Sequence, residues 1–163
     1  MSPPKSSKDA TEGGIKIVSD NRKASHNYFL EERYEAGMVL TGTEVKSLRD
    51  GKANLADSYA MFRGRELFLI NAHITEYKQG NINNHEPTRT RKLLLNTAEL
   101  NKLWGKLEIK GYSLIPTKLY FKNGKAKVEI AVGRGKKAFD KRASEKEKEV
   151  KRDLAKVMKH KQR

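Results

Sequence analysis

Alternating apolar and polar positions predict a series of short strands between about residues 26 and 132. From His26 to Tyr34 the larger apolar side chains fall mostly on even positions, a period of two that is typical of a half-buried strand. The clearest hairpin lies near the end of this region, where two alternating runs flank Asn123-Gly124. Asn-Gly favours the tight turn that joins antiparallel strands. Further strands are predicted at 38–40, 58–62, 66–74, 90–95 and 112–115.

Two short helices are predicted among these strands. The first is capped by Thr43 and ends at Gly51. The second has Asn96 at the N-cap and Glu99 three residues later, a capping-box arrangement. Its predicted buried stripe consists of Leu100, Leu103, Trp104 and Leu107. Several short strands with two small helices predict a mainly β fold, an antiparallel barrel with short helices at its ends or flanks.

The two ends of the chain differ from the region between them. Residues 1–20 contain little that could be buried and are predicted to form a disordered N-terminal tail. Residues 21–133 are predicted to form the barrel domain. Residues 134–163 are predicted to form a basic tail. Strong helix formers begin at about Ala143, but their apolar stripe is too thin to dock firmly, so this tail should be disordered in solution and helical only against a partner.

The charge balance indicates a polyanionic partner. The 163 residues carry a formal net charge of +15, and residues 134–163 alone carry 13 basic and 5 acidic side chains. Nucleic acid and an anionic membrane surface both fit that charge. The longest apolar runs, such as 67–70, are too short to span a bilayer, and the N-terminus has no apolar signal segment. We therefore expect a cytoplasmic protein without a membrane partner, and the absence of cysteine fits a reducing compartment.

No catalytic or metal-binding constellation is evident, so we expect neither an enzyme nor a cofactor. The four histidines are scattered, there is no cysteine, and no serine is paired with a base. The glycines and lysines of 133–137 lack the spacing of a phosphate-binding loop. Strand alternation separates Glu32 from Glu31 and Glu35, which favours solvent-facing carboxylates over a nuclease metal site. Such a carboxylate can still accept hydrogen bonds from base amino groups.

Two groups of residues leave alternatives open. Arg89, Arg91 and Lys92 form either a solubilising strand edge or a phosphate-contacting stripe, and the sequence favours neither. The aromatic residues Tyr28, Phe29, Tyr34 and Phe62 could stack on bases, although core positions are the more common use of aromatics in a barrel.

Several motifs in a fixed order resemble the small protein B family, the bacterial SsrA-binding proteins that partner transfer-messenger RNA. They are EAG at 35–37, GTEVKSLR at 42–49, GKAN at 51–54, PTRTRKLLLN at 87–96, GKK at 135–137 and DKR at 140–142. The resemblance runs from about Asn21 to the C-terminus. It implies a closed barrel similar to the oligonucleotide-binding (OB) fold and no catalytic activity.

The resemblance also implies a function in rescuing ribosomes. The protein would bind the tRNA-like domain of transfer-messenger RNA and enter the vacant decoding site of a stalled 70S ribosome, with its tail in the message channel. Elongation factor Tu would belong to the delivery complex. Translation would resume on the transfer-messenger RNA, which tags the nascent peptide for proteolysis. A ribosomal protein with a basic extension has the same composition, but should bind ribosomes without a second RNA.

By motif, Glu35, Leu94 and Asn96 match family positions that contact the tRNA-like domain, and Arg91 and Lys92 are expected beside them. Phe139 stands where family members commonly have histidine, so stacking on a ribosomal base would survive there, but a hydrogen bond or charge from the imidazole would not. The tail residues implied in ribosome binding are Gly135, Lys136, Lys137, Phe139, Asp140, Lys141, Arg142, Val157 and Met158.

Overall fold

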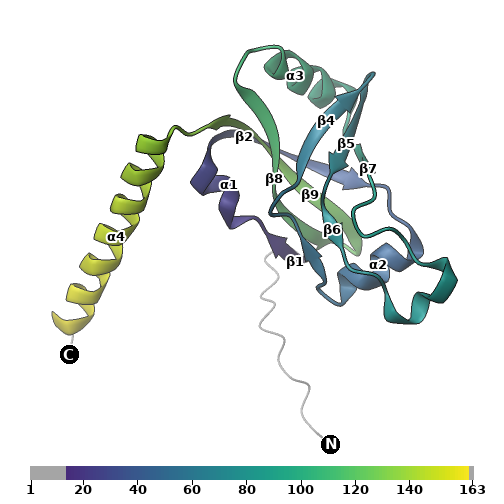
Figure 1. Cartoon of the computed structure of the whole chain (residues 1–163), viewed down its shortest axis with the longest axis horizontal. Helices are drawn as coiled ribbons and strands as arrows, with labels where there is room; N and C mark the ends of the chain where they lie inside the picture. The colour runs from purple at the N-terminus through teal and green to yellow at the C-terminus, as the bar shows by residue number, and fades with distance from the viewer. Residues whose placement is uncertain (1–13, 162–163) are drawn as a thin grey trace, which may run out of the picture.

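A strongly curved antiparallel sheet organises the computed structural model, which describes residues 14–161 (Figure 1). The strands are β1 (Ile15–Asp20), β2 (Tyr28–Met38), β3 (Ala53–Asn54), β4 (Tyr59–Arg63), β5 (Glu66–Ile70), β6 (His73–Ile74), β7 (Arg91–Leu94), β8 (Tyr112–Lys122) and β9 (Lys125–Gly135). The α-helices are α1 (Arg22–Asn27), α2 (Gly42–Arg49), α3 (Thr97–Leu107) and α4 (Ala138–Lys161), and a 3-10 helix, η2, spans Lys78–Asn83. The expected mainly β fold is confirmed.

The strand order explains how one sheet surrounds a core. Its order is β1-β8-β4-β5-β7-β2-β9, and β9 also pairs with β8, so the order returns to β8. The β4–β8 junction is the weakest part of this arrangement, because its register contains the single pair Ala60↔Leu114. The short strands β3 and β6 form a separate two-stranded sheet.

The predicted Asn-Gly hairpin is confirmed as the β8–β9 pair. Asn123 and Gly124 both have positive φ, 51° and 77°, as a type I′ turn requires. Alternate residues of the two strands point into the core, including the fully buried Leu119, Val128 and Ile130.

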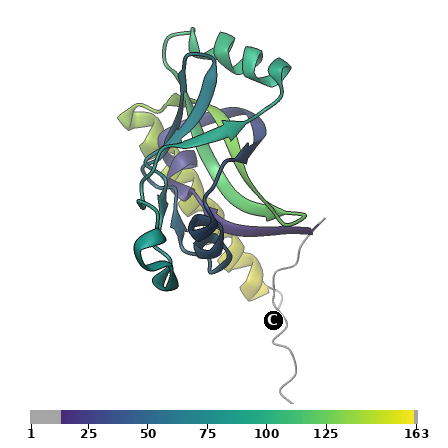
Figure 2. The ribbon, with the colours of Figure 1, turned by 90° about the vertical axis from the view of Figure 1, so that its right-hand side faces the viewer.

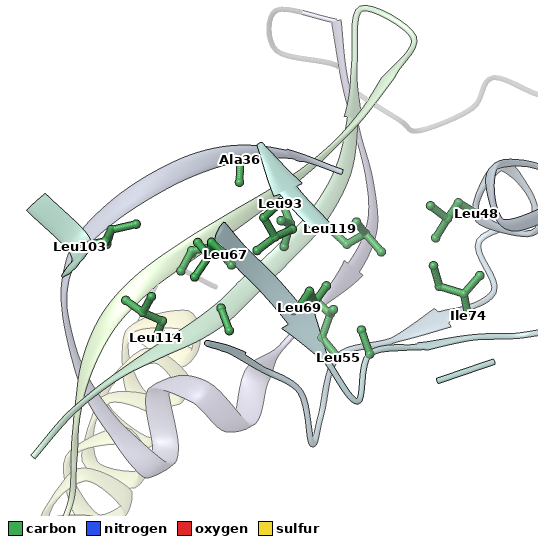
Figure 3. Packing of buried hydrophobic residues seen from close by; sticks show 14 of the residues in the cluster. Ala36, Leu48, Leu55, Leu67, Leu69, Ile74, Leu93, Leu103, Leu114 and Leu119 are labelled. Carbon is green, nitrogen blue, oxygen red and sulfur yellow. The ribbon is translucent and has the colours of Figure 1, made fainter. Parts of the chain in front are cut away.

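Leucine dominates the core that the sheet encloses (Figure 3). Leu103 of α3 covers one end of the cluster, while Leu48 of α2 and Ile74 of β6 lie together at the other end. Trp104 was expected in the buried stripe of α3, but it is not buried. It lies at the margin of α3, is 45% exposed, and packs edge-to-face against Phe62 with ring centroids 5.1 Å apart.

The N-terminal boundary needs correction. Disorder was expected through residue 20, but Ile15–Asp20 forms β1 on the free edge of β8, from Ile15↔Lys122 to Asp20↔Lys118. Residues 1–13 lie outside the described part of the chain. The following helix α1 was not predicted, because it buries a single apolar side chain, Ala24, and so has no helical stripe.

Three other boundaries differ from the predicted ones. Two strands were expected at 26–34 and 38–40, but Tyr28–Met38 forms one strand, β2, with a register shift between Leu30 and Arg33; residues 26–27 belong to α1, and 39–40 lie outside the sheet. The strand expected at 66–74 breaks after Ile70, where Asn71 has a φ of 62°. The cap of α2 is Thr41 rather than Thr43, since the Thr41 hydroxyl accepts from Glu44 N and the Thr41 N–H donates to Glu44 Oε1 at 2.8 Å, which completes a capping box.

Most of the basic tail, Ala138–Lys161, forms one helix, α4, that projects from the body beside α1 (Figures 1 and 2). It begins at Ala138, earlier than the expected helix start near Ala143, and β9 runs to Gly135, two residues beyond the expected end of the barrel domain. Its apolar side chains Val150, Leu154, Val157 and Met158 are all more than half exposed. Within residues 14–161, the helices lack the combination of length and apolar character that a bilayer crossing needs.

Candidate nucleic-acid interface

A row of residues on the outer side of the sheet crosses four adjacent strands, and its member on β8, Tyr120, is only 8% exposed. Leu94 of β7 is opposite Gly37 of β2, Gly37 is opposite Lys127 of β9, and Lys127 is opposite Tyr120 of β8. Their chain neighbours Leu93, Ala36 and Val128 are buried, so strand alternation places the row on the outer face of the sheet. We call these four residues the outer row.

Glu35, which the motif match assigns to RNA contact, lies on this outer face. It lies two residues from Gly37 on β2, and so on the same side of the strand. The β2–β7 pairing ends at Gly37 and Leu94, and Asn96 follows two residues later as the N-cap of α3. The fold therefore places Glu35 and Leu94 on one face of two paired strands, although they are about 60 residues apart in the sequence, and Asn96 lies at the start of the helix that follows.

Glu35 is held as a carboxylate by its neighbours. The Tyr120 hydroxyl donates to Glu35 Oε2 at 2.5 Å, and Lys122 Nζ lies 3.4 Å from the same oxygen. The hydrogen bond from Tyr120 is the main cause that lowers the pKa of Glu35; burial opposes it, and Lys122 and Lys127 add to the lowering. Burial, followed by the bond to Glu35, raises the pKa of Tyr120. The side chain of Glu35 stays 36% exposed, so its carboxylate can accept further hydrogen bonds.

Leu94 and Asn96 offer different chemistry beside that carboxylate. Leu94 is an exposed apolar side chain, 51% accessible, and the missing side chain of Gly37 leaves space between it and Lys127. The side-chain oxygen of Asn96 accepts from Glu99 N at 2.9 Å, which confirms the predicted cap of α3. The amide nitrogen of Asn96 has no hydrogen-bond partner among the described residues.

Arg91 does not belong to this surface, contrary to expectation. Its side chain is fully buried and forms an ion pair with the equally buried Glu44. It also donates to Ala72 O at 2.7 Å and Pro87 O at 3.0 Å. Each of the three guanidinium nitrogens thus donates a hydrogen bond inside the protein, and a phosphate could not reach this buried group. The motif match placed it in the interface because burial cannot be deduced from a basic residue in a short strand.

The other two basic residues of that segment are only partly available. Arg89 donates to Glu44 Oε1 at 2.6 Å and to Val39 O at 3.2 Å. Lys92 Nζ lies 3.1 Å from Glu66 Oε1, and both of these side chains are substantially exposed. Because exposed pairs of this kind are weak, Lys92 could exchange its partner for a phosphate.

The remaining carboxylates of β2 are exposed, in agreement with the solvent-facing interpretation. The Tyr112 hydroxyl donates to Glu31 at 3.1 Å, and the Tyr34 hydroxyl donates to Glu32 at 2.6 Å. The bond to Glu32 is the main cause that raises the pKa of Tyr34 to about 12. In residues 14–161 as described, three potential metal ligands do not come together anywhere.

The predicted tail residues are separated from the outer row. Gly135 ends β9 opposite Tyr28, while Lys137 and Arg142 are exposed. Asp140 accepts from Lys137 N at 3.3 Å at the start of α4, and Lys141 is half-buried. The Lys136 ammonium donates a hydrogen bond to Ser25 O of α1. Val157 and Met158 are 54% and 67% exposed near the end of the helix. The side chain of Phe139 lies outside the described structure.

Sequence reasoning missed Tyr120, Lys122 and Lys127 as members of the surface. Their signal was present in the predicted hairpin, because they alternate with the core positions of its two strands. Together with Glu35 and Leu94, they combine cations for phosphates, an anionic acceptor for base edges, and an apolar contact. This combination is suited to binding RNA and contains no group arranged for bond cleavage.

Comparison with known proteins gives a consistent result. A family model described as "SmpB protein" matches residues 18–160. The SsrA-binding proteins of Geobacter sulfurreducens and Thermoanaerobacter pseudethanolicus are 55% and 57% identical, each over 91% of this chain and over 97% and 95% of their own lengths. A chain in the solved structure "tmRNA-SmpB: a journey to the center of the bacterial ribosome" is 50% identical, with a TM-score of 0.63, over 74% of this chain and 85% of that one.

Proposed function

The chain belongs to the SmpB family of SsrA-binding proteins, and we propose that it binds the tRNA-like domain of transfer-messenger RNA and delivers this RNA to stalled ribosomes. There the message would be exchanged for that of the transfer-messenger RNA, so that the nascent peptide is tagged for proteolysis and the ribosome is released. The observation that carries the proposal is the match to residues 18–160, which spans both the sheet and most of the basic tail.

In this proposal the outer row and its neighbours contact the tRNA-like domain. Lys122 and Lys127 neutralise phosphates, which supplies affinity without base preference. Glu35 accepts hydrogen bonds from base amino groups, a function for which its lowered pKa suits it. Leu94 packs against an apolar part of the RNA, and Asn96 donates through its amide nitrogen.

The tail is assigned to the ribosome. We propose that residues 134–163, which carry 13 basic side chains, pass the decoding site and follow the message channel, where the exposed ones among them balance ribosomal phosphates. Phe139 stacks on a ribosomal base, and the stripe that includes Val157 and Met158 packs against the channel. Beyond its attachment to the body the tail folds fully only there, because an exposed helix of this kind is marginal in water.

The proposal includes four further features. The sheet acts as a closed, OB-like barrel in binding RNA, which is supported by the return of the strand order to β8. Elongation factor Tu accompanies the complex during delivery. The protein acts in the cytoplasm and has no catalytic activity of its own.

The decisive experiment recovers the RNA bound to this protein in cells and sequences it. Transfer-messenger RNA should dominate, whereas a ribosomal protein would carry ribosomal RNA alone. In vitro, affinity for the isolated tRNA-like domain should fall steeply with salt, because phosphate neutralisation releases counterions.

A variant with alanine at Glu35, Leu94 and Asn96 should bind the tRNA-like domain at least tenfold more weakly, since each removes a separate contact of about 1 kcal/mol. Met61→Ala is the matched control, because Met61 is also exposed and apolar but lies on β4, outside this surface. Equal affinity of the triple variant and the control would show that the RNA binds elsewhere.

A further inference from the structure

The junction between body and tail is built around one lysine. Lys136 Nζ donates to Ser25 O of α1 at 3.0 Å and to Ser144 Oγ of α4 at 2.9 Å. The same ammonium lies 5.0 Å from the centre of the Phe29 ring on β2. The Lys136 N–H donates to Asn27 O at 2.8 Å, so the backbone is fixed at this point as well.

These contacts join α4 to two consecutive elements, α1 and β2, that lie far from it in the sequence. Ser25 and Phe29 precede Lys136 by more than 100 residues, whereas Ser144 lies two turns into α4. Ser144 in turn donates to Asp140 O at 3.0 Å, inside the same helix. A second link between α1 and α4 is the pair His26 Nε2 and Glu145 Oε1, 3.5 Å apart. All side-chain links between α4 and the body that the structure describes therefore involve residues 136–145.

The next lysine is different. The side chain of Lys137 is exposed and has no hydrogen bond or ion pair within the described residues. The two lysines of the GKK segment are therefore not equivalent, although the sequence motif presents them as one basic pair. An ammonium has three donors, and two donors of Lys136 are committed while the ammonium also lies against an aromatic ring.

We propose that Lys136 is a positioning residue that fixes the direction in which α4 leaves the body, and that its charge acts inside the protein rather than on a phosphate. The anchored segment gives α4 an oriented first part from which the rest of the helix can extend, and nucleation is the costly step of helix formation. The consequence for peptide tagging rests on the proposed function, while the anchoring itself does not.

The chain contains no cysteine, which permits a direct measurement of tail orientation. Cysteines introduced at Lys125, at the β8–β9 turn, and at Lys146, directly after the anchored segment of α4, are exposed and can carry spin labels. Distances between the labels are then measured by double electron–electron resonance in otherwise wild-type protein, in Lys136→Gln, in Lys136→Arg and in the matched control Lys137→Gln.

We expect one distance population in wild type and Lys137→Gln, a distribution at least twice as broad in Lys136→Gln, and partial restoration by Lys136→Arg, which keeps the charge and donors. Affinity of Lys136→Gln for the isolated tRNA-like domain should stay within twofold of wild type. Its tagging rate should fall about tenfold, as expected when a charge-assisted hydrogen bond is lost.

An unchanged distance distribution in Lys136→Gln, or an equal change in Lys137→Gln, would overturn the positioning role. Wild-type tagging by a Lys136→Gln protein whose tail has become mobile would overturn the link between orientation and function. Failure of the wild-type protein to bind transfer-messenger RNA would refute the proposed function instead, and the distance measurement would still decide the anchoring.

Discussion

Replacement of Glu44 by glutamine should destabilise the protein much more than replacement of an exposed charged residue. Glu44 belongs to the GTEVKSLR run, yet its side chain is fully buried. Its carboxylate accepts from Arg91 Nε, from Arg89 Nη2 at 2.6 Å, and from Thr41 N at 2.8 Å. Glutamine keeps one acceptor oxygen, but its amide NH2 then faces N–H groups that also need an acceptor. The fully buried Arg91 is left without a counter-charge.

The size of the effect follows from that burial. Breaking a buried ion pair by removing one partner costs about 3–5 kcal/mol, because water cannot replace the lost partner. For a domain of this size the loss corresponds to a Tm lower by roughly 10–20 °C. The matched control is Glu66→Gln, which breaks the exposed Lys92–Glu66 pair and should cost less than about 1 kcal/mol.

Urea unfolding followed by circular dichroism measures both variants. Glu44→Leu combined with Arg91→Met should regain part of the stability, because it removes both buried charges. Similar losses in Glu44→Gln and Glu66→Gln would refute the reasoning, since they would mean that burial does not distinguish the two pairs.

The Glu44 carboxylate also makes the stability of the folded state depend on pH. Burial alone would raise the pKa of Glu44, but the hydrogen bonds from Arg89, Thr41 and Arg91 outweigh it and hold the pKa below its usual value. The folded state therefore releases this proton more readily than the unfolded state. The stabilisation is complete above the unfolded pKa, about 4.3, and is lost as the pH falls through the lower folded pKa. Glu44→Gln should flatten the stability curve in that acid range.

Three further predictions concern binding and tagging. Truncation after Gly135, or Glu149→Pro in α4, should leave affinity for the tRNA-like domain within about twofold but abolish tagging, because proline breaks the helix; joint loss of affinity and tagging in the truncated protein would contradict this division. Tyr120→Phe should raise the pKa of Glu35 toward its ordinary value, measurable by NMR titration, and an unchanged pKa would exclude the Tyr120 hydroxyl as its main cause. Phe139→His should keep tagging and Phe139→Ala should lose about tenfold, since base stacking is worth about 1–3 kcal/mol; equal tagging by both would exclude stacking.

The parts of the fold that the sequence predicted are those with local signals. The hairpin at Asn123-Gly124 needs positive φ at two adjacent residues, and Asn-Gly supplies it. The cap of α3 needs only a side chain three residues from an N–H, as Asn96 provides. By contrast, β1 depends on the edge of β8, about 100 residues later, and α1 buries a single apolar side chain. Neither dependence is visible in a local window.

The residues of the candidate site also differ in whether the sequence alone could place them on the surface. Glu35 and Leu94 could be named from motifs and lie together, because strand alternation and register preserve what the motifs imply. The prediction for Arg91 was wrong because its guanidinium pairs with Glu44 inside the protein. Lys136 differs from Lys137 because its ammonium donates hydrogen bonds to α1 and α4. A basic residue in a basic protein has two possible partners, an external phosphate or an internal acceptor. Only the folded distances decide between them, so the count of 35 lysines and arginines overstates the number that are free to meet RNA.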